Sequence, residues 1–240
     1  HEAFYGLEFS KDGRQLFCSG AGDEVVHAFD FRQGSLTNHH QIKVRDAKLR
    51  GIPAGLAVDG NAKRLFVANL WADRVTRIGL SPHTAPADIV VGTNAAPFWM
   101  EPVKDSDSIE DTPAQKREEM SGYQTRADAT FPYACRLDEE SGRLYVSLWA
   151  QATVAVIDLR SEQVVQRWPT QEHPCEMALT RSGKLLYVAN SCRNTVTVLD
   201  TKTGKTLETV CAALYPQSPP GSTPNSLALS PDERTLFVAN

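Results

Sequence analysis

A unit of two alternating runs recurs along this chain and constrains its fold more than any other feature of the sequence. The cleanest copy is residues 184–204, KLLYVANSCRNTVTVLDTKTG. Its first run alternates up to Asn190, a short polar bend follows, and a second alternating run ends at Asp200. Two period-two runs joined by a few turn residues predict a pair of antiparallel strands.

The unit returns at a regular spacing. Residues 15–31, 64–80 and 143–159 align with it without gaps, and residues 234–240 begin a further copy. A short strand precedes each copy, and in four of the five it starts at a proline: Pro53, Pro132, Pro174 and Pro224. An outer strand follows each complete copy, as at residues 164–168. Four strands per unit at a period of about 40–50 residues are typical of β-propeller blades.

We therefore predict an all-β chain, a β-propeller of four-stranded antiparallel blades. The predicted blades cover residues 4–44, 53–92, 130–171 and 172–221, and residues 222–240 form the first half of a fifth blade. Because so few blades cannot close on one another, we expect an open arc. We interpret the chain as an excerpt of a larger ring.

One segment, residues 93–130, breaks the period between blades two and three. Residues 101–128 carry eight acids and four bases, so this stretch is acidic. One interpretation is a surface excursion between two blades. The other is a lid or a docking surface for another domain, because long loops in compact domains are commonly functional or disordered.

Composition narrows the class of partner. The chain has 240 residues, of which 41% are apolar, and this is enough to bury a substantial core in a single domain. Its formal net charge of −4 gives no basic surface for nucleic acid or for an anionic membrane. No apolar run approaches the roughly 20 residues of a membrane span.

Three charged residues occupy positions on the innermost strands that hold small residues in the other blades. Glu8 and Arg136 align with alanines at positions 57, 178 and 228, and Glu176 aligns with glycine, alanine and serine at positions 55, 134 and 226. These positions lie beside the central channel, where buried charges must be paired or solvated. A structural ion pair and a ligand site at the channel mouth both remain open, because channel mouths are where propellers bind ligands.

Three of the five cysteines are expected to be small core residues. Cys18 and Cys135 align with Val, Leu and Met at core positions of the other repeats, and Cys211 ends an outer strand. We expect all three to be buried.

Cys175 and Cys192 differ, because both stand at variable loop-edge positions of one blade. Folding of the hairpin between them brings them close, which allows a disulfide in an oxidising compartment. A metal site that includes His173 is an alternative, although three candidate ligands are few.

The sequence offers no catalytic motif. Gly204-Lys205-Thr206 ends like a phosphate-binding loop, but Leu199 stands where that loop requires its first glycine. No Gly-x-Ser-x-Gly elbow and no Cys-x-x-Cys pair occur. We therefore predict no catalytic residue, no metal site and no cofactor within this segment.

The repeat resembles the YVTN-type propeller repeat, named for runs like residues 187–190, YVAN. It is similar in particular to the propeller that precedes an alkaline-phosphatase-superfamily phosphoesterase domain in exported bacterial proteins. Residues 144–159, 213–240 and 4–31 carry this resemblance. It implies a periplasmic or extracellular protein whose C-terminal domain is catalytic. The phosphoesterase residues of that family would lie beyond this segment, so none is assigned here.

Three functional classes follow from these observations. The first is a non-catalytic module that recognises a small molecule or a protein, or that docks a catalytic domain of the same chain. The second is an enzyme within the propeller, such as a lactonase-like hydrolase, for which Glu8, Arg136 and Glu176 are the only support. The third, a quinoprotein-like electron-transfer subunit, lacks a cofactor motif in this sequence.

Overall fold

The computed structural model describes residues 5–92, 128–213, 215, 219 and 221–240. Within this part of the chain, regular structure consists of β-strands and three single-turn 3-10 helices, η1 (Ala21–Asp23), η2 (Ala47–Leu49) and η3 (Trp149–Gln151). The predicted all-β class is confirmed. The docking segment predicted at residues 93–130 falls almost entirely outside the described residues.

Four sheets each contain four sequential antiparallel strands. The first holds β1 (Leu7–Phe9), β2 (Gln15–Ser19), β3 (Val25–Arg32) and β4 (Ser35–Lys43). The second holds β5 (Pro53–Val58), β6 (Arg64–Asn69), β7 (Arg74–Leu80) and β8 (His83–Val90). The third holds β9 (Pro132–Asp138), β10 (Arg143–Leu148), β11 (Thr153–Asp158) and β12 (Gln163–Pro169). The fourth holds β13 (Pro174–Leu179), β14 (Leu185–Asn190), β15 (Thr195–Asp200) and β16 (Thr206–Cys211).

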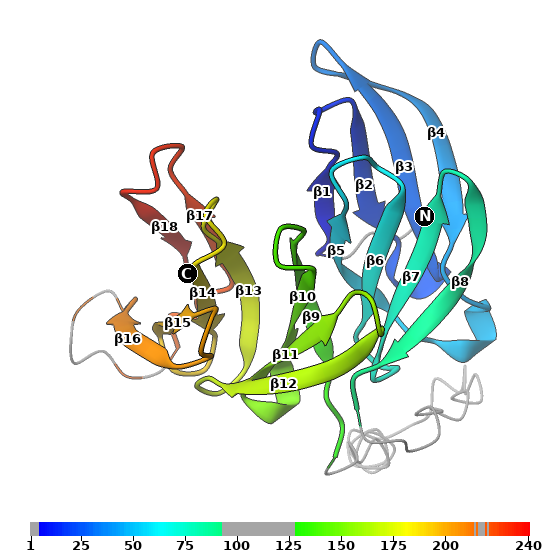
Figure 1. The fold of residues 1–240 in the computed structure, drawn as a ribbon. Coiled ribbons are helices and arrows are strands. Elements are labelled where there is room, and N and C mark those ends of the chain that lie inside the picture. The colour runs from blue at the N-terminus through cyan, green and yellow to red at the C-terminus, as the bar shows by residue number, and fades with distance from the viewer. Residues whose placement is uncertain (1–4, 93–127, 214, 216–218, 220) are drawn as a thin grey trace, which may run out of the picture.

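The last two strands, β17 (Ser226–Leu229) and β18 (Leu236–Ala239), form a separate two-stranded sheet. The first strand of each sheet contacts the first strand of the next, from β1 through β5, β9 and β13 to β17. The sheets therefore stand side by side around a common inner edge, as the blades of a propeller do (Figure 1). The first and last sheets share no ladder among the described strands, so the arc is open, as predicted.

Apolar clusters fill the three interfaces between complete blades. The alternation of side chains along a strand sends one set toward the preceding blade and the other toward the following blade. One aromatic position in the middle of the second strand shows this clearly. Phe17, Phe66 and Tyr145 are 1%, 0% and 0% exposed, because each packs in a cluster shared with the following blade. The equivalent Phe237 is 59% exposed.

Each inner strand is entered through a residue with a left-handed backbone. These residues are Tyr5, Ile52, Phe131, His173 and Thr223, with φ between 44° and 61°. Such a conformation is costly for side chains other than glycine, so the surrounding contacts must hold it. In the three middle blades, the carbonyl of this residue accepts a hydrogen bond from the amide that follows the second strand, at 3.0 Å in each case. The repeat therefore fixes the entry of each strand as well as its pairing.

The return of the chain into blade three is also anchored. Thr130 is fully buried, and both its amide and its hydroxyl donate to Oδ1 of Asp73 in blade two, at 2.7 and 2.6 Å. This contact fixes the start of β9 against the second blade.

Candidate functional site at the channel

The three charged residues expected beside the channel come together in the structure. Glu8 lies on β1, Arg136 on β9 and Glu176 on β13. Nη2 of Arg136 is 2.5 Å from Oε1 of Glu176, and its Nη1 is 4.0 Å from Oε2 of Glu8. These contacts join blades one, three and four directly across the channel.

A fourth member, Tyr5, was missed by sequence reasoning. Its hydroxyl donates to Oε2 of Glu176 at 2.5 Å, and its ring lies 4.4 Å from the ring of Tyr133 between centroids. Tyr5 precedes the first inner strand, and this copy of the repeat is the one without the proline found at Pro53, Pro132, Pro174 and Pro224. The missing proline was the one sequence signal that the entry of this strand, and therefore Tyr5, differs from the other repeats. We call Tyr5, Glu8, Arg136 and Glu176 the channel cluster.

The polar groups of the channel cluster are largely satisfied within the protein. Nε of Arg136 donates to the carbonyl of Met177 at 2.7 Å, and its Nη1 donates to the carbonyl of Cys135 at 2.9 Å. Oε1 of Glu176 also accepts from the amide of Met177 at 2.8 Å. This arrangement satisfies the demand that buried charges be paired and hydrogen-bonded. It favours the structural interpretation of these charges.

Burial and mutual attraction set the protonation states of the channel cluster. Burial raises the pKa of the Glu8 carboxyl above its usual range, although Arg136 opposes this effect. Burial and the Glu176 carboxylate together raise the pKa of Tyr5 far above its ordinary value, so its hydroxyl stays a donor. Burial disfavours the charge on Arg136, but Glu176 and Glu8 outweigh it and raise the pKa of the guanidinium. Arg136 is therefore a permanent cation held between two carboxyl groups.

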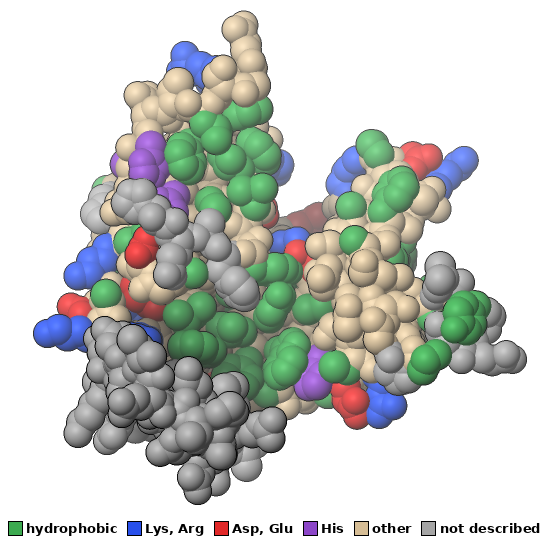
Figure 2. All heavy atoms as spheres, turned by 180° about the vertical axis from the view of Figure 1, so that it is seen from behind, with side chains coloured by type: hydrophobic (Ala, Val, Ile, Leu, Met, Phe, Trp, Pro, Cys, Tyr) green, Lys and Arg blue, Asp and Glu red, His purple; other side chains and the backbone are tan. Residues whose placement is uncertain are grey.

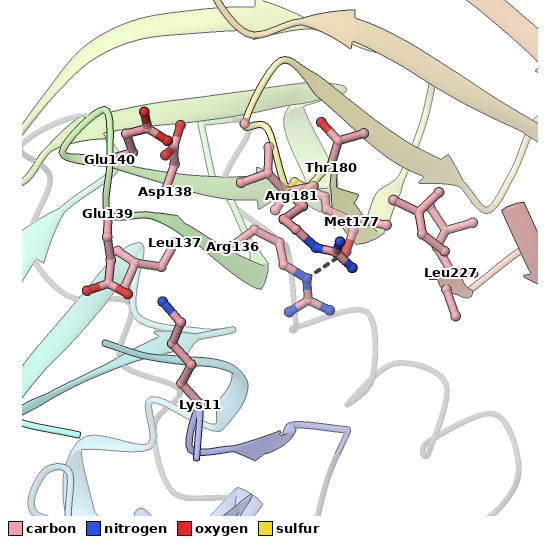
Figure 3. A pocket seen from close by; sticks show the side chains of 15 residues that line it. Lys11, Arg136, Leu137, Asp138, Glu139, Glu140, Met177, Thr180, Arg181 and Leu227 are labelled. Carbon is pink, nitrogen blue, oxygen red and sulfur yellow. Dashed lines mark hydrogen bonds between the residues drawn. The ribbon is translucent and has the colours of Figure 1, made fainter. Parts of the chain in front are cut away.

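A pocket of about 520 Å³ opens beside the channel cluster. Lys11 enters it from the first blade and Arg136 from β9, and Met177 and Leu227 line it from β13 and β17 (Figure 3). Seen from behind, a notch separates the two ends of the arc, with basic and acidic side chains at its base (Figure 2). The volume lies in the range of small-molecule sites. The channel therefore offers a space of ligand size next to its fixed charges.

The rim of this pocket carries both signs of charge. Lys11 and Arg181 supply exposed cationic side chains, and Glu139 and Glu140 supply carboxylates. The carboxylate of Glu139 also accepts from the amide of Gly60 at 2.8 Å, so it links blades two and three. Among the described residues, no group of three or more His, Cys, Asp or Glu is placed to hold a metal ion. The chemistry on offer is the binding of a polar ligand that carries charge.

The predicted bridge between Cys175 and Cys192 is wrong. All five cysteines are free thiols. Pro174 pairs with Asn190, and the register then shifts by one residue before Met177, so a bulge falls between Pro174 and Met177. The buried Sγ of Cys175 turns toward blade five and donates to the carbonyl of Pro224 at 3.2 Å. Cys192 lies beyond the end of β14, where its Sγ contacts His173 instead.

Burial was predicted correctly for one of the other three cysteines and wrongly for two. Cys135 is fully buried, as predicted, and burial raises the pKa of its thiol to about 12. Cys18 is only partly buried, because it lies on the opposite face of β2 from Phe17, which packs toward blade two. Cys211 is exposed at the end of β16. The expectation of burial was therefore wrong for these last two residues.

Comparisons with known proteins agree with the fold. No protein-family profile matches the chain. A curated relative, Antigen Lp49 of Leptospira interrogans, is 25% identical over 245 residues, which cover 94% of this chain and 42% of the relative. The chain therefore spans less than half of the length of the curated relative that it matches.

Among solved structures, hydrazine synthase of Kuenenia stuttgartiensis superposes with a TM-score of 0.66 at 18% identity, over 98% of this chain and 54% of that one. A likeness at this level of identity shows the fold alone. Together with the four blades around the channel, it defines the chain as a β-propeller. In the described residues no helix is long and apolar enough to cross a membrane.

Proposed function

We propose that this chain is a non-catalytic recognition module that binds a charged peptide segment in the channel pocket. The observation that carries the proposal is the pocket of about 520 Å³ whose walls come from blades one, three, four and five. The inner wall of the site is built from strands of several blades, which favours preorganised binding. The charged rim residues lie on the turns that follow these strands. Lys11 and Arg181 provide partners for carboxylates, and Glu139 and Glu140 provide partners for amines.

The channel cluster supports this role because its charged groups interact with one another. The Arg136 guanidinium forms ion pairs with Glu176 and Glu8, and the Glu176 carboxylate accepts a hydrogen bond from Tyr5. Arg136 is the member of the channel cluster that lines the pocket, and because it is already paired within the protein, recognition is left to the rim. A peptide carrying both signs of charge fits this rim better than a uniformly charged ligand, because it can pair with both sets of side chains.

The test uses a pooled tripeptide library and ligand-observed NMR on the purified chain. Lys11→Glu reverses one charge at the rim, and Lys205→Glu makes the same change at an exposed turn outside the pocket. We expect Lys11→Glu to weaken the binding of acidic tripeptides at least about fivefold, while Lys205→Glu leaves it unchanged.

A second variant fills the pocket instead of changing its charge. Leu227→Trp should abolish binding of every hit, whereas Leu207→Trp on the exposed face of β16 should not. Thermal unfolding of each variant shows whether the fold is retained. The proposal fails if no tripeptide binds, or if both members of each pair behave alike.

The competing enzyme class makes a different prediction. A lactonase-like or phosphoesterase activity within the propeller requires turnover that depends on the channel carboxylates. We expect the purified segment to hydrolyse neither a chromogenic phosphate ester nor a chromogenic lactone, with or without divalent metal ions. Metal-dependent turnover that disappears in Glu176→Gln would establish the enzyme class instead.

We further propose that the module belongs to an exported bacterial protein and is followed there by a phosphoesterase domain. Support comes from the resemblance of residues 144–159, 213–240 and 4–31 to such propellers. The matched relative is more than twice as long as the aligned region, and its name, antigen, agrees with a protein that antibodies encounter. The coding sequence downstream of Asn240 tests this directly, because a metal-binding phosphoesterase domain must be encoded there.

A further inference from the structure

A thiol and an imidazole meet on the fourth blade, at the opposite end of the inner strand from the channel pocket. Nδ1 of His173 lies 2.5 Å from Sγ of Cys192. His173 immediately precedes β13, and Cys192 follows the end of β14. Both side chains are partly exposed, so a small molecule in solution can reach them.

The position of His173 is fixed by contacts of both its backbone and its ring. Its backbone is left-handed, with a φ of 55°, and its carbonyl accepts from the amide and from the hydroxyl of Ser191 at 3.0 and 3.1 Å. Its ring stacks on the indole of Trp149 with 3.8 Å between centroids and 14° between planes. The imidazole is therefore held against the thiol rather than free to rotate away.

An ion pair brackets the same contact. Arg193 Nη2 lies 2.7 Å from Glu172 Oε1, so the residues next to Cys192 and His173 also pair with each other. The other blades do not repeat this chemistry. Ile52 and Trp71 hold the equivalent positions in blade two, and Phe131 and Ala150 hold them in blade three.

Of the other four cysteines, Cys135, Cys175 and Cys211 lack this combination of access and a basic partner. Cys18 is partly buried opposite His27, and burial raises the pKa of its thiol. Cys135 and Cys175 are buried, and burial raises the pKa of each thiol to about 12. Cys211 is more exposed than Cys192, but no histidine contacts it in the described part of the chain. The chain thus contains its own comparison between an accessible thiol with an imidazole and an accessible thiol without one.

We propose that Cys192 is a nucleophilic thiol, with His173 as its general base, that exchanges with low-molecular-weight disulfides. Nδ1 takes the proton of the thiol, and the thiolate attacks one sulfur of the disulfide. A bond forms between Sγ and that sulfur while the original disulfide bond breaks. The departing thiolate takes the proton back from the imidazolium, so the products are a mixed disulfide on Cys192 and one free thiol.

The test measures the rate of modification at each cysteine of the folded chain. The protein is incubated with excess oxidised glutathione near pH 7, quenched with acid and mapped by mass spectrometry. An ordinary thiol is only a few per cent thiolate at this pH, so we expect Cys192 to react about tenfold faster than Cys211 despite its lower exposure. In chain unfolded by guanidinium the two rates should become equal.

Matched variants distinguish the effect of the general base on the reaction rate from the effect of solvent exposure of the thiol. His173→Gln should lower the rate at Cys192 to that of Cys211 or below, while His40→Gln, at an exposed histidine of the first blade, should leave it unchanged. Cys192→Ser should remove the fast adduct and Cys211→Ser should keep it. Circular dichroism confirms that each variant is folded. Equal rates at Cys192 and Cys211 in the folded chain, or a fast rate that survives in His173→Gln, would overturn the proposal.

Discussion

Blade three and the half-blade at the end of the chain share one repeat but differ in what covers them. Tyr145 on β10 and Phe237 on β18 occupy the same position, yet Tyr145 is fully buried and Phe237 is 59% exposed. Tyr145 packs with Met177 and Leu186 of blade four, and its ring lies 5.3 Å from that of Trp168. The difference shows that contacts with the next blade, in addition to those within its own sheet, complete the burial of this aromatic ring.

The first blade shows the same contrast between its two faces. Phe17, which faces blade two, is 1% exposed, whereas Leu7 and Phe9 on the other face are 62% and 44% exposed. Figure 2 shows hydrophobic side chains gathered on the lobe that carries β3 and β4. Both ends of the arc therefore present apolar faces, as expected when stability comes from contacts between neighbouring repeats.

The largest expected effect is the difference between the two aromatic positions. Tyr145→Ala should lower the free energy of unfolding by about 3–5 kcal/mol, because it empties a filled interface between blades. Phe237→Ala should lower it by less than about 1 kcal/mol, because most of that ring already faces solvent. Urea denaturation of the two variants measures both values. Equal losses would contradict the view that neighbouring blades supply the burial.

The next test compares an ion pair in the channel with an ion pair on the surface by the free energy of unfolding that is lost when the arginine is removed. Arg136→Met should cost about 2–3 kcal/mol, since it leaves the Glu176 carboxylate without its cationic partner in a largely enclosed site. Arg193→Met removes an ion pair whose partners are 52% and 54% exposed, and should cost less than about 0.5 kcal/mol. If the two substitutions cost the same in urea denaturation, the channel cluster is not structural.

A smaller effect follows from the raised pKa of Glu8. The folded chain holds this proton more tightly than the unfolded chain, so ionisation of Glu8 destabilises the fold as the pH rises above the ordinary carboxyl value of 4.5. The melting temperature of Glu8→Gln should therefore rise relative to that of the wild type as the pH moves from about 4.5 toward neutrality.

Asp12 provides a control of opposite sign. Its carboxylate accepts from Ser10 and from the amide of Arg14, and these bonds lower its pKa. Its contribution to stability is present above the ordinary carboxyl range and is lost as the pH falls. Asp12→Asn should consequently be less stable than the wild type at neutral pH and approach it in acid. Parallel behaviour of the two variants would rule out the assigned causes.

Much of the fold could be predicted because the repeat carries its own register. Alternation located the strands, and alignment of the copies showed that Glu8, Arg136 and Glu176 share the inner edge. Alignment could not supply Tyr5, because its contact with Glu176 spans 171 positions and no repeat copy encodes it. Which residues meet across the channel depends on how strongly the arc curves, and periodicity does not report curvature.

The cysteines show a second limit. Cys175 and Cys192 were expected to face each other, but a one-residue shift in pairing before Met177 turned Cys175 toward blade five. A shift of one residue moves a side chain to the other face of a strand. Sequence alternation locates a strand but not a bulge within it. For Cys211 the error was different, because the alignment did not reveal how little covers the end of β16.

The central claim is that the entry of the first blade is bonded across the channel to the fourth. A double-mutant cycle on Tyr5→Phe and Glu176→Leu tests it most directly, because each change removes one partner of the hydrogen bond. The loss of the Arg136 ion pair in Glu176→Leu occurs with and without the Tyr5 hydroxyl, so the cycle cancels it. Urea denaturation of the wild type, the two single variants and the double variant gives the coupling energy. We predict a coupling of about 1–2 kcal/mol, as for a hydrogen bond to a charged acceptor. Additive effects, with a coupling within about 0.3 kcal/mol of zero, would contradict the claim.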